Sequence, residues 1–379
     1  MRLGIFDVRE WQTMVDIENG RKVAADGSVI RMVKQVMNDH PYPGDISADS
    51  NRWVTDISLE LTRRYQPDFA FICYSQPYFT ARFDPISQDN WQQLMASVFA
   101  EVDRFLDASG FTPVIVGSGD MIPLKGYIDL SGLDGLAIAS NWAAHYAGLY
   151  HPSSDDFAAI RRLSQIERVV SREEFLQQFD GGPEVAGQIP DYLLVAAEGY
   201  AFKALSTSIR PLVKIPAHND FIPVYTSLGT VSSITGIRSL IESRIDHQKV
   251  ALILIEGIGT LDFPLSCQQC SNGRHWYSYE PGDCQYLALT TGQHQFFEYS
   301  PGYRYYLDDN ENQAYPFSGY FDRVPASTLA DAFSGRSIAV GNRSMLMHIT
   351  SGTDIAIECF SRKLYNHGLM AAIKQDELP

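Results

Sequence analysis

The sequence predicts an α/β fold: a doubly wound, mostly parallel sheet with helices on both faces and an inserted irregular or β-rich lobe. Three observations support this prediction. Short apolar runs rich in Val, Ile and Phe recur along the 379 residues. Longer amphipathic stretches separate these runs, as strand–helix alternation requires. One stretch rich in Tyr, Gly, Pro and Gln interrupts the alternation between residues 262 and 325.

The apolar runs are the expected strands. Their hydrophobicity is nearly continuous rather than alternating, which is typical of parallel strands covered by helices on both faces. The runs are residues 2–7, 68–75, 112–118, 192–197, 249–256 and 336–341.

The amphipathic stretches are the expected helices. Residues 50–65 and 89–107 carry large apolar side chains at helical spacing, and less regular patterns occupy 154–164, 233–247 and 355–373. We therefore expect residues 1–261 and 326–379 to form one α/β domain and residues 262–325 to form the inserted lobe.

Composition limits the classes of partner. Lys and Arg total 30 against 45 Asp and Glu, so the formal charge is −15. Nucleic acids and anionic membranes require basic surface, so we expect neither, and we expect a small-molecule substrate or ligand. The longest aliphatic run, Val250 to Ile255, is far shorter than the ~20 residues that span a bilayer.

Cysteine usage and the N-terminus indicate a cytoplasmic protein. The first residues, MRLGIFDVRE, place charges within the apolar run and do not resemble a signal peptide. Five cysteines is an odd number, and Cys73 and Cys359 lie in apolar contexts. A disulfide framework is therefore not expected, and a reducing compartment is.

The order of segments from 60 to 123 resembles a known family. RRYQPD leads into the strand FAFICYS, the loop QPYFTARFDP, a helix containing EVDRFLDASGF and the strand PVIVGSGDMIP. IERVVSREEF, IPDYLLVAAEGYAF and IPAHNDFIPVY follow. This order is similar to the later half of the alkaline phosphatase superfamily, especially its type I phosphodiesterase/nucleotide pyrophosphatase branch. The resemblance implies a metal-dependent hydrolase of small phosphate- or sulfate-type esters.

The family usually opens with a strand that ends in Asp-Gly, where the Asp binds metal. The best match here is VALILIEGIG, which ends in Glu256-Gly257 two-thirds of the way along the chain, and PASTLADAFSGRSIAVG at 325–341 resembles what normally follows. We interpret the chain as a circularly permuted relative. This interpretation requires the segment near 250 to lie beside the strands near 70 and 115 in one continuous sheet.

The metal-ligand motifs depart from the family pattern. Pro77 and Ala81 stand at the loop positions of an Asp and a His ligand, and Ser118 and Gly119 stand at those of another pair. His218 stands where the resemblance expects a late histidine. The usual two-zinc site requires about six Asp and His ligands. The resemblance therefore implies a remodelled or single-metal site, or a descendant that has lost hydrolysis.

Four residues are the candidate site. If the fold prediction is right, Glu256, Asp120, His218 and Asp220 gather at the carboxyl ends of strands, where the ligand sites of open α/β sheets lie. They could hold one divalent ion, zinc or manganese, or Glu256, Asp120 and His218 could act as acid and base. The alternative is that they are strand-end polar residues that cap turns. Asp84, in an Asp-Pro turn, is a lesser candidate.

Cys267 and Cys270 form a C-x-x-C pair, followed by His275 and Cys284. These four side chains could complete a tetrahedral structural zinc site in the inserted lobe. Reduced cysteines without a metal are the alternative. Two functions therefore remain open: a hydrolase with a remodelled site, or a non-hydrolytic descendant that serves as a ligand-binding or assembly protein.

Overall fold

The structure is a computed structural model. It describes residues 3–7, 14–16, 22–23, 27–44, 46–139, 144–179, 189–204, 207–208, 210–294, 327–343, 351–362 and 365–374.

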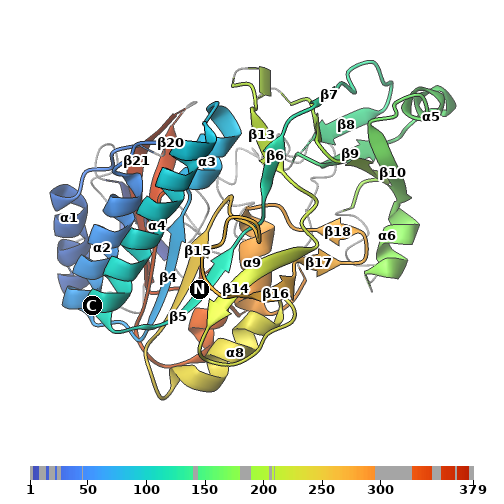
Figure 1. Ribbon diagram of the computed structural model, residues 1–379. Coiled ribbons are helices and arrows are strands. Elements are labelled where there is room, and N and C mark those ends of the chain that lie inside the picture. Colours follow the sequence, from blue (N-terminus) through green and yellow to red (C-terminus); the bar gives the residue numbers. More distant parts are fainter. Residues whose placement is uncertain are drawn as a thin grey trace.

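A large mixed sheet forms the centre of the molecule (Figure 1). Eleven of the strands in the described residues belong to it, in the order β16-β14-β5-β15-β4-β19-β20-β21-β1-β2-β3. Its middle is parallel and consists of β5 (Thr112–Gly117), β15 (Val250–Ile255), β4 (Phe69–Tyr74), β19 (Ser337–Gly341) and β20 (Ile355–Arg362). The predicted α/β class is confirmed.

Antiparallel strands extend the parallel centre on both sides. On one side lie β14 (Phe221–Thr226) and β16 (Gln268–Ser271). On the other lie β21 (Tyr365–Lys374), β1 (Leu3–Asp7), β2 (Met14–Asp16) and β3 (Lys22–Val23). The expected strand at 2–7 therefore exists, but it pairs antiparallel with β21.

The segment near 250 occupies the centre of this sheet. Every residue of β15 pairs in parallel with β4 on one side and with β5 on the other, from Val250 to Ile255. All six side chains are buried, because both faces of the strand are covered. The predicted neighbourhood of the strands near 70, 115 and 250 is confirmed.

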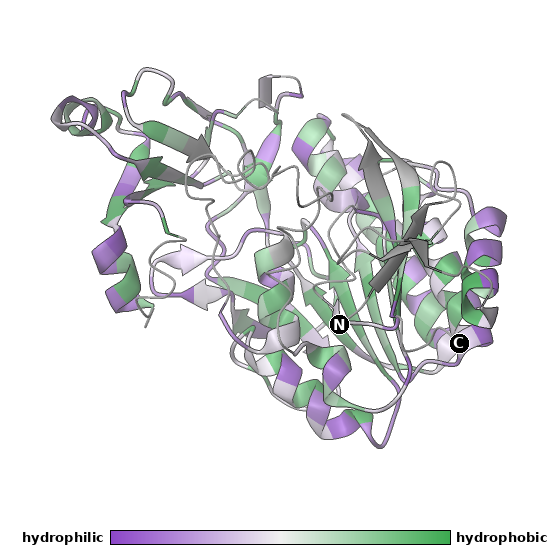
Figure 2. Cartoon of the chain, turned by 180° about the vertical axis from the view of Figure 1, so that it is seen from behind, coloured by the Kyte–Doolittle hydropathy of each residue, from purple (hydrophilic) through white to green (hydrophobic). Residues whose placement is uncertain are grey.

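Helices cover both faces of the sheet (Figure 2). α1 (Ser28–Asp39), α2 (Ser50–Tyr65) and α4 (Gln88–Ser109) pack with Ala70, Ile72 and Tyr74 of β4. α8 (Gly236–Ile245) and α9 (Asp283–Thr291) pack with Phe69, Phe71 and Cys73. Successive side chains of a strand point to opposite faces of the sheet, so alternate residues of β4 contribute to two different cores.

The ends of α4 agree with its local sequence. The Ser87 hydroxyl accepts a hydrogen bond from the backbone N–H of Asn90, which satisfies one free donor of the first turn. Gly110 ends the helix with a φ of 70°, a left-handed conformation that glycine adopts without strain. The predicted helices at 50–65 and 89–107 are confirmed, and 154–164 and 233–247 contain the shorter α5 (Ser154–Ile160) and α8.

The predicted helix at 355–373 is wrong. These residues form the antiparallel pair β20–β21. Ile355, Ile357 and Cys359 are buried on one face of β20, while Ala356 and Glu358 are buried on the other. Because both faces are covered, the apolar residues do not alternate with polar ones, and the sequence pattern does not separate such a strand from a buried helix.

A smaller antiparallel lobe stands beside the main sheet (Figure 1). Its four-stranded sheet has the order β10-β11-β9-β8, and the expected strand at 192–197 belongs to it as β11. The lobe elements are β6 (Met121–Pro123), β7 (Gly126–Ile128), β8 (Leu136–Ala139), β9 (Tyr146–Tyr150), α5, β10 (Ile166–Ser171), α6 (Arg172–Gln178), β11 (Tyr192–Ala196), β12 (Tyr200–Phe202) and β13 (Lys214–Pro216).

The segment expected to form the inserted lobe, 262–325, is described only as far as residue 294. In this part β16 joins the main sheet, β17 (Gly273–Arg274) pairs with β18 (Tyr277–Ser278), and α9 packs on the sheet. Two further short helical elements are α3 (Gln76–Phe83) and a 3-10 turn at Leu329–Ala332. Within the described residues, none of the helices is long and apolar enough to cross a bilayer.

Candidate functional site

Polar side chains gather at the carboxyl ends of the parallel strands. Glu256 directly follows β15 and is completely buried. Arg343, two residues after β19, donates from Nη1 to Glu256 Oε1 at 2.5 Å. The Tyr286 hydroxyl of α9 donates to the same oxygen. The carboxylate is therefore neutralised by a buried guanidinium from the end of β19, which lies on the far side of β4 from β15.

Aromatic rings and a thiol surround this ion pair. The Arg343 guanidinium lies 4.7 Å from the centre of the Tyr78 ring and 5.6 Å from that of Phe79. Cys73 Sγ lies 3.2 Å from the Tyr286 hydroxyl. Burial, followed by the charge of Glu256, raises the pKa of Cys73 to about 12, so this thiol is not ionised at neutral pH.

Ser118 links the ends of β5 and β15 by a hydrogen bond. Its hydroxyl accepts a hydrogen bond of 2.8 Å from the backbone N–H of Gly257. Gly257 has a φ of 78°, and a Cβ at this position would lie 2.8 Å from the Tyr78 Cα. The chain can therefore turn after Glu256 only with glycine.

Asp120 follows β5, and Glu256 follows the adjacent strand β15. The Asp120 carboxylate nevertheless faces a different loop. Backbone N–H groups of Leu261, Gly259 and Thr260 donate to it. Burial outweighs these hydrogen bonds and raises the pKa of Asp120 above its ordinary value. These hydrogen bonds to the backbone of 259–261 agree with the alternative interpretation, in which Asp120 is a polar residue at a strand end that caps a turn.

His218 belongs to a second cluster, which the sequence analysis did not anticipate. Its ring centre lies 4.3 Å from that of His145, at an interplanar angle of 78°. His145 Nδ1 lies 2.8 Å from Glu280 Oε1, and both of these side chains are buried. His218 Nδ1 lies 3.5 Å from Glu198 Oε2 and 4.0 Å from Glu167 Oε2.

The Glu280 carboxylate is held by three donors. Besides His145 Nδ1, the backbone N–H groups of Ala144 and His145 donate to it, at 2.7 and 2.8 Å. Burial alone would raise the pKa of Glu280, but the attraction of His145 and these hydrogen bonds hold it below its ordinary value. For His218, burial and the adjacent His145 lower the pKa, so the neutral imidazole is favoured.

The remaining predicted residues lie apart. The Asp220 side chain is exposed, and its backbone carbonyl accepts from Asn272 N–H at 2.8 Å. Asp84 follows the last residue of α3 as its C-cap. In the part of the chain that the structure describes, no three or more His, Cys, Asp or Glu side chains form a group that could hold a metal ion. Neither Glu256, Asp120, His218 and Asp220 nor Cys267, Cys270, His275 and Cys284 therefore form such a group.

All five cysteines lie within the described residues, and none of them forms a disulfide. Cys270 is buried in β16, and burial raises its pKa to about 12. Cys267 is partly exposed. We expect iodoacetamide to alkylate Cys267 in the native protein but to spare Cys73 and Cys270, because only an accessible thiolate reacts.

Peptide mass mapping before and after urea unfolding measures this pattern. Complete labelling of Cys270 in the native protein would contradict the buried position of β16. Protection of Cys267 that disappears on addition of a chelator would instead indicate a zinc ion on the C-x-x-C pair.

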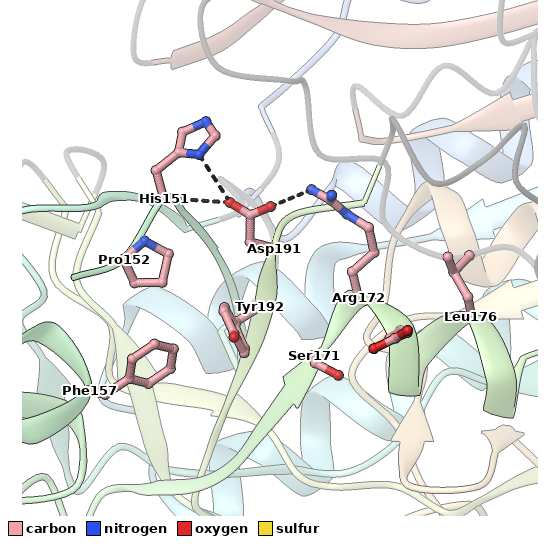
Figure 3. A pocket seen from close by; sticks show the side chains of 9 residues that line it. His151, Pro152, Phe157, Ser171, Arg172, Leu176, Asp191 and Tyr192 are labelled. Carbon is pink, nitrogen blue, oxygen red and sulfur yellow. Dashed lines mark hydrogen bonds and ion pairs between the residues drawn. The ribbon is translucent and has the colours of Figure 1, made fainter. Parts of the chain in front are cut away.

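A pocket of about 570 Å³ lies in the antiparallel lobe (Figure 3). Arg172, at the start of α6, donates from Nη2 to Asp191 Oδ1 at 2.7 Å, and the His151 backbone N–H donates to Asp191 Oδ2. Apolar side chains form much of the remaining wall. The lining residues are His151, Pro152, Phe157, Ser171, Arg172, Glu173, Leu176, Asp191 and Tyr192.

Sequence reasoning missed four residues of these clusters: Arg343, Tyr286, His145 and Glu280. Glu280 and His145 lie in segments without a recognisable motif, and their approach depends on the packing of the lobe against 277–281. Arg343 follows the predicted strand at 336–341, so its position at a strand end was available from the sequence.

The chain matches no protein-family model, and a search of the curated proteins finds no significant match.

Proposed function

We propose that this chain is a non-hydrolytic, ligand-binding descendant of the phosphodiesterase scaffold that its segment order resembles. One observation carries the proposal. Glu256 stands at the position where the resemblance places the first metal ligand, and its carboxylate already holds the Arg343 cation and the Tyr286 hydroxyl. A buried carboxylate with these partners has its charge compensated within the protein.

The position of β15 between β4 and β5 supports the permuted scaffold, because this neighbourhood is the one that the permuted order requires. The proposed setting is the reducing cytoplasm, which the free cysteines support.

The lobe pocket is the proposed ligand site. It is an open hollow of about 570 Å³, which can seat part of a small molecule while the rest stays in solvent. Phe157, Tyr192 and Leu176 offer apolar surface, and Arg172 lies at its edge beside Asp191. We expect a small amphipathic ligand with an apolar face and one polar or anionic group, because such a molecule matches both parts of the wall.

Hydrolysis of a small phosphate- or sulfate-type ester is the second candidate. One observation favours it: Glu280 fixes His145 through Nδ1, as a carboxylate orients a general base. His218 lies beside it. In this alternative, the histidines, with Glu256 and Asp120, supply the acid–base groups.

Turnover of bis(p-nitrophenyl) phosphate and p-nitrophenyl sulfate separates the two candidates. We expect background rates for the wild-type protein and for the variants Glu256→Gln, Asp120→Asn and His218→Gln. Saturable wild-type turnover that falls at least about 100-fold in these variants would favour the hydrolase, since loss of a general acid or base costs about 10²–10⁴ in rate.

Thermal-shift screening of small amphipathic acids tests the binding site. A ligand that raises the melting temperature of the wild-type protein should have a much smaller effect on Arg172→Ala. The control is Arg162→Ala, at an exposed position outside the pocket, which should keep the full shift. Equal shifts in both variants would remove the pocket from the proposal.

A further inference from the structure

We propose that His145 and His218 together bind one late first-row divalent metal ion of the class that includes zinc, copper and nickel. The proposal rests on this histidine pair alone, and it does not require the ligand-binding function above. It also differs from the candidate metal set predicted from the sequence, because Glu256 and Asp120 take no part.

The His145 ring is arranged as a metal-binding histidine is, and His218 has a carboxylate near the same ring nitrogen. A histidine that binds metal through one ring nitrogen almost always donates its other N–H to a carboxylate or carbonyl, which fixes the tautomer and the ring orientation. Glu280 occupies this position at 2.8 Å from His145 Nδ1. The Glu198 carboxylate lies 3.5 Å from His218 Nδ1 as an ion-pair partner and accepts a hydrogen bond from the His218 backbone N–H at 3.0 Å.

The other nitrogen of each ring has no hydrogen-bond partner among the described residues. His145 Nε2 and His218 Nε2 are both buried, and His145 as a whole is 1% exposed. A buried acceptor without a donor costs about 1–3 kcal/mol, so each such atom in a folded protein requires an explanation. When the proton is on Nδ1, Nε2 has a free lone pair, and this nitrogen is the one that would donate to a metal ion.

The separation of the rings suits one shared ion. At a Zn–N distance of about 2.0–2.1 Å, each ring centre lies about 3.2 Å from the metal, and two rings at a tetrahedral angle have centres about 5 Å apart. The centres here are 4.3 Å apart, with the ring planes nearly perpendicular. A shared ion therefore requires the ring centres to separate by roughly 1 Å, and the His218 side chain, which is 26% exposed, is the less confined of the two.

The surrounding charge favours a cation. Glu280, Glu198 and Glu167 all face the histidine pair, from three different segments of the chain. Imidazole ligands suit zinc, copper and nickel more than magnesium or calcium, which identifies the class of ion. Two protein ligands leave two positions of a tetrahedral ion for water or a bound molecule.

Isothermal titration with Zn²⁺ alone, on protein first freed of metal by chelator, tests the site. We expect one ion per chain in the wild-type protein and at least about tenfold weaker binding in His145→Gln and in His218→Gln. Glu280→Gln should also weaken binding, by about 10–100-fold, as loss of an outer-shell carboxylate does. His247→Gln, at an exposed position after α8, is the matched control and should bind as the wild type does.

Spectroscopy supplies a second measurement. Cu²⁺ added at one equivalent should show nitrogen hyperfine structure from two imidazoles in electron paramagnetic resonance, and either histidine variant should lose it. The melting temperature of each variant shows that it is folded, and His218→Gln remains informative if His145→Gln is not. Undiminished Zn²⁺ binding in folded His218→Gln, or Zn²⁺ binding lost only in Cys267→Ser, would overturn the proposal.

Discussion

Replacement of Arg343 by methionine is expected to destabilise the protein by about 3–5 kcal/mol. The substitution removes the cation but keeps most of the side-chain volume, so it leaves the Glu256 carboxylate charged, buried and without its partner. Removal of one member of a buried ion pair typically costs this much, because the remaining charge has lost both water and its counter-charge. Arg343 is 2% exposed and Glu256 is 0% exposed, so solvent cannot compensate.

Urea unfolding followed by circular dichroism measures the change. The double variant Glu256→Gln/Arg343→Met should recover much of the loss, because it removes both charges. The control is Lys203→Met, which breaks the exposed pair with Asp129 and should cost under about 1 kcal/mol. If Arg343→Met lowers the free energy of unfolding by less than about 1 kcal/mol, Glu256 is not a buried carboxylate that depends on Arg343 for its counter-charge.

Replacement of Glu280 by glutamine is the second large effect that we expect, at about 2–3 kcal/mol. The carboxylate accepts from His145 Nδ1 and from the backbone N–H groups of Ala144 and His145. A glutamine amide presents one oxygen and one NH₂ group, so at least one of these buried donors would face another donor. An unsatisfied buried donor costs about 1–3 kcal/mol, and hydrogen bonds to a charged group are stronger than neutral ones.

The pH dependence gives this effect a definite sign. Because the pKa of Glu280 is lower in the folded protein than its ordinary value of 4.5, folding favours the ionised form. Its contribution is therefore present above about pH 4.5 and is lost as the pH falls through the lowered pKa. The stability difference between metal-free wild type and Glu280→Gln should shrink on acidification. Glu198→Gln, at a half-exposed position, should show a smaller difference throughout.

Four of the five parallel strands, β5, β15, β4 and β19, were predictable because their information is local. Each of them is a short, almost wholly apolar run, and β15, with the sequence VALILI, pairs along its entire length with β4 and β5. The segment order then indicated which runs are neighbours. The same local pattern failed at 355–373, where residues buried on both faces carry no period that separates a strand from a helix.

The candidate site was predictable only in part. Glu256 and Asp120 do follow neighbouring strands, as their sequence positions require. Their side chains nevertheless turn to different partners, Glu256 to Arg343 and Asp120 to the backbone of 259–261. A position at a strand end places the Cα, whereas the direction of a side chain depends on which donors the surrounding loops bring within about 3 Å.

The amino-acid sequence by itself determined the α/β class, four of the five parallel strands and the two long helices, because apolar period and capping act within a few residues. Only the tertiary structure decided what the charged groups do. Arg343 reaches Glu256 across 87 residues, and His145 reaches Glu280 across 135. A buried charge must find its partner wherever the packed chain supplies one, and no local pattern records that choice.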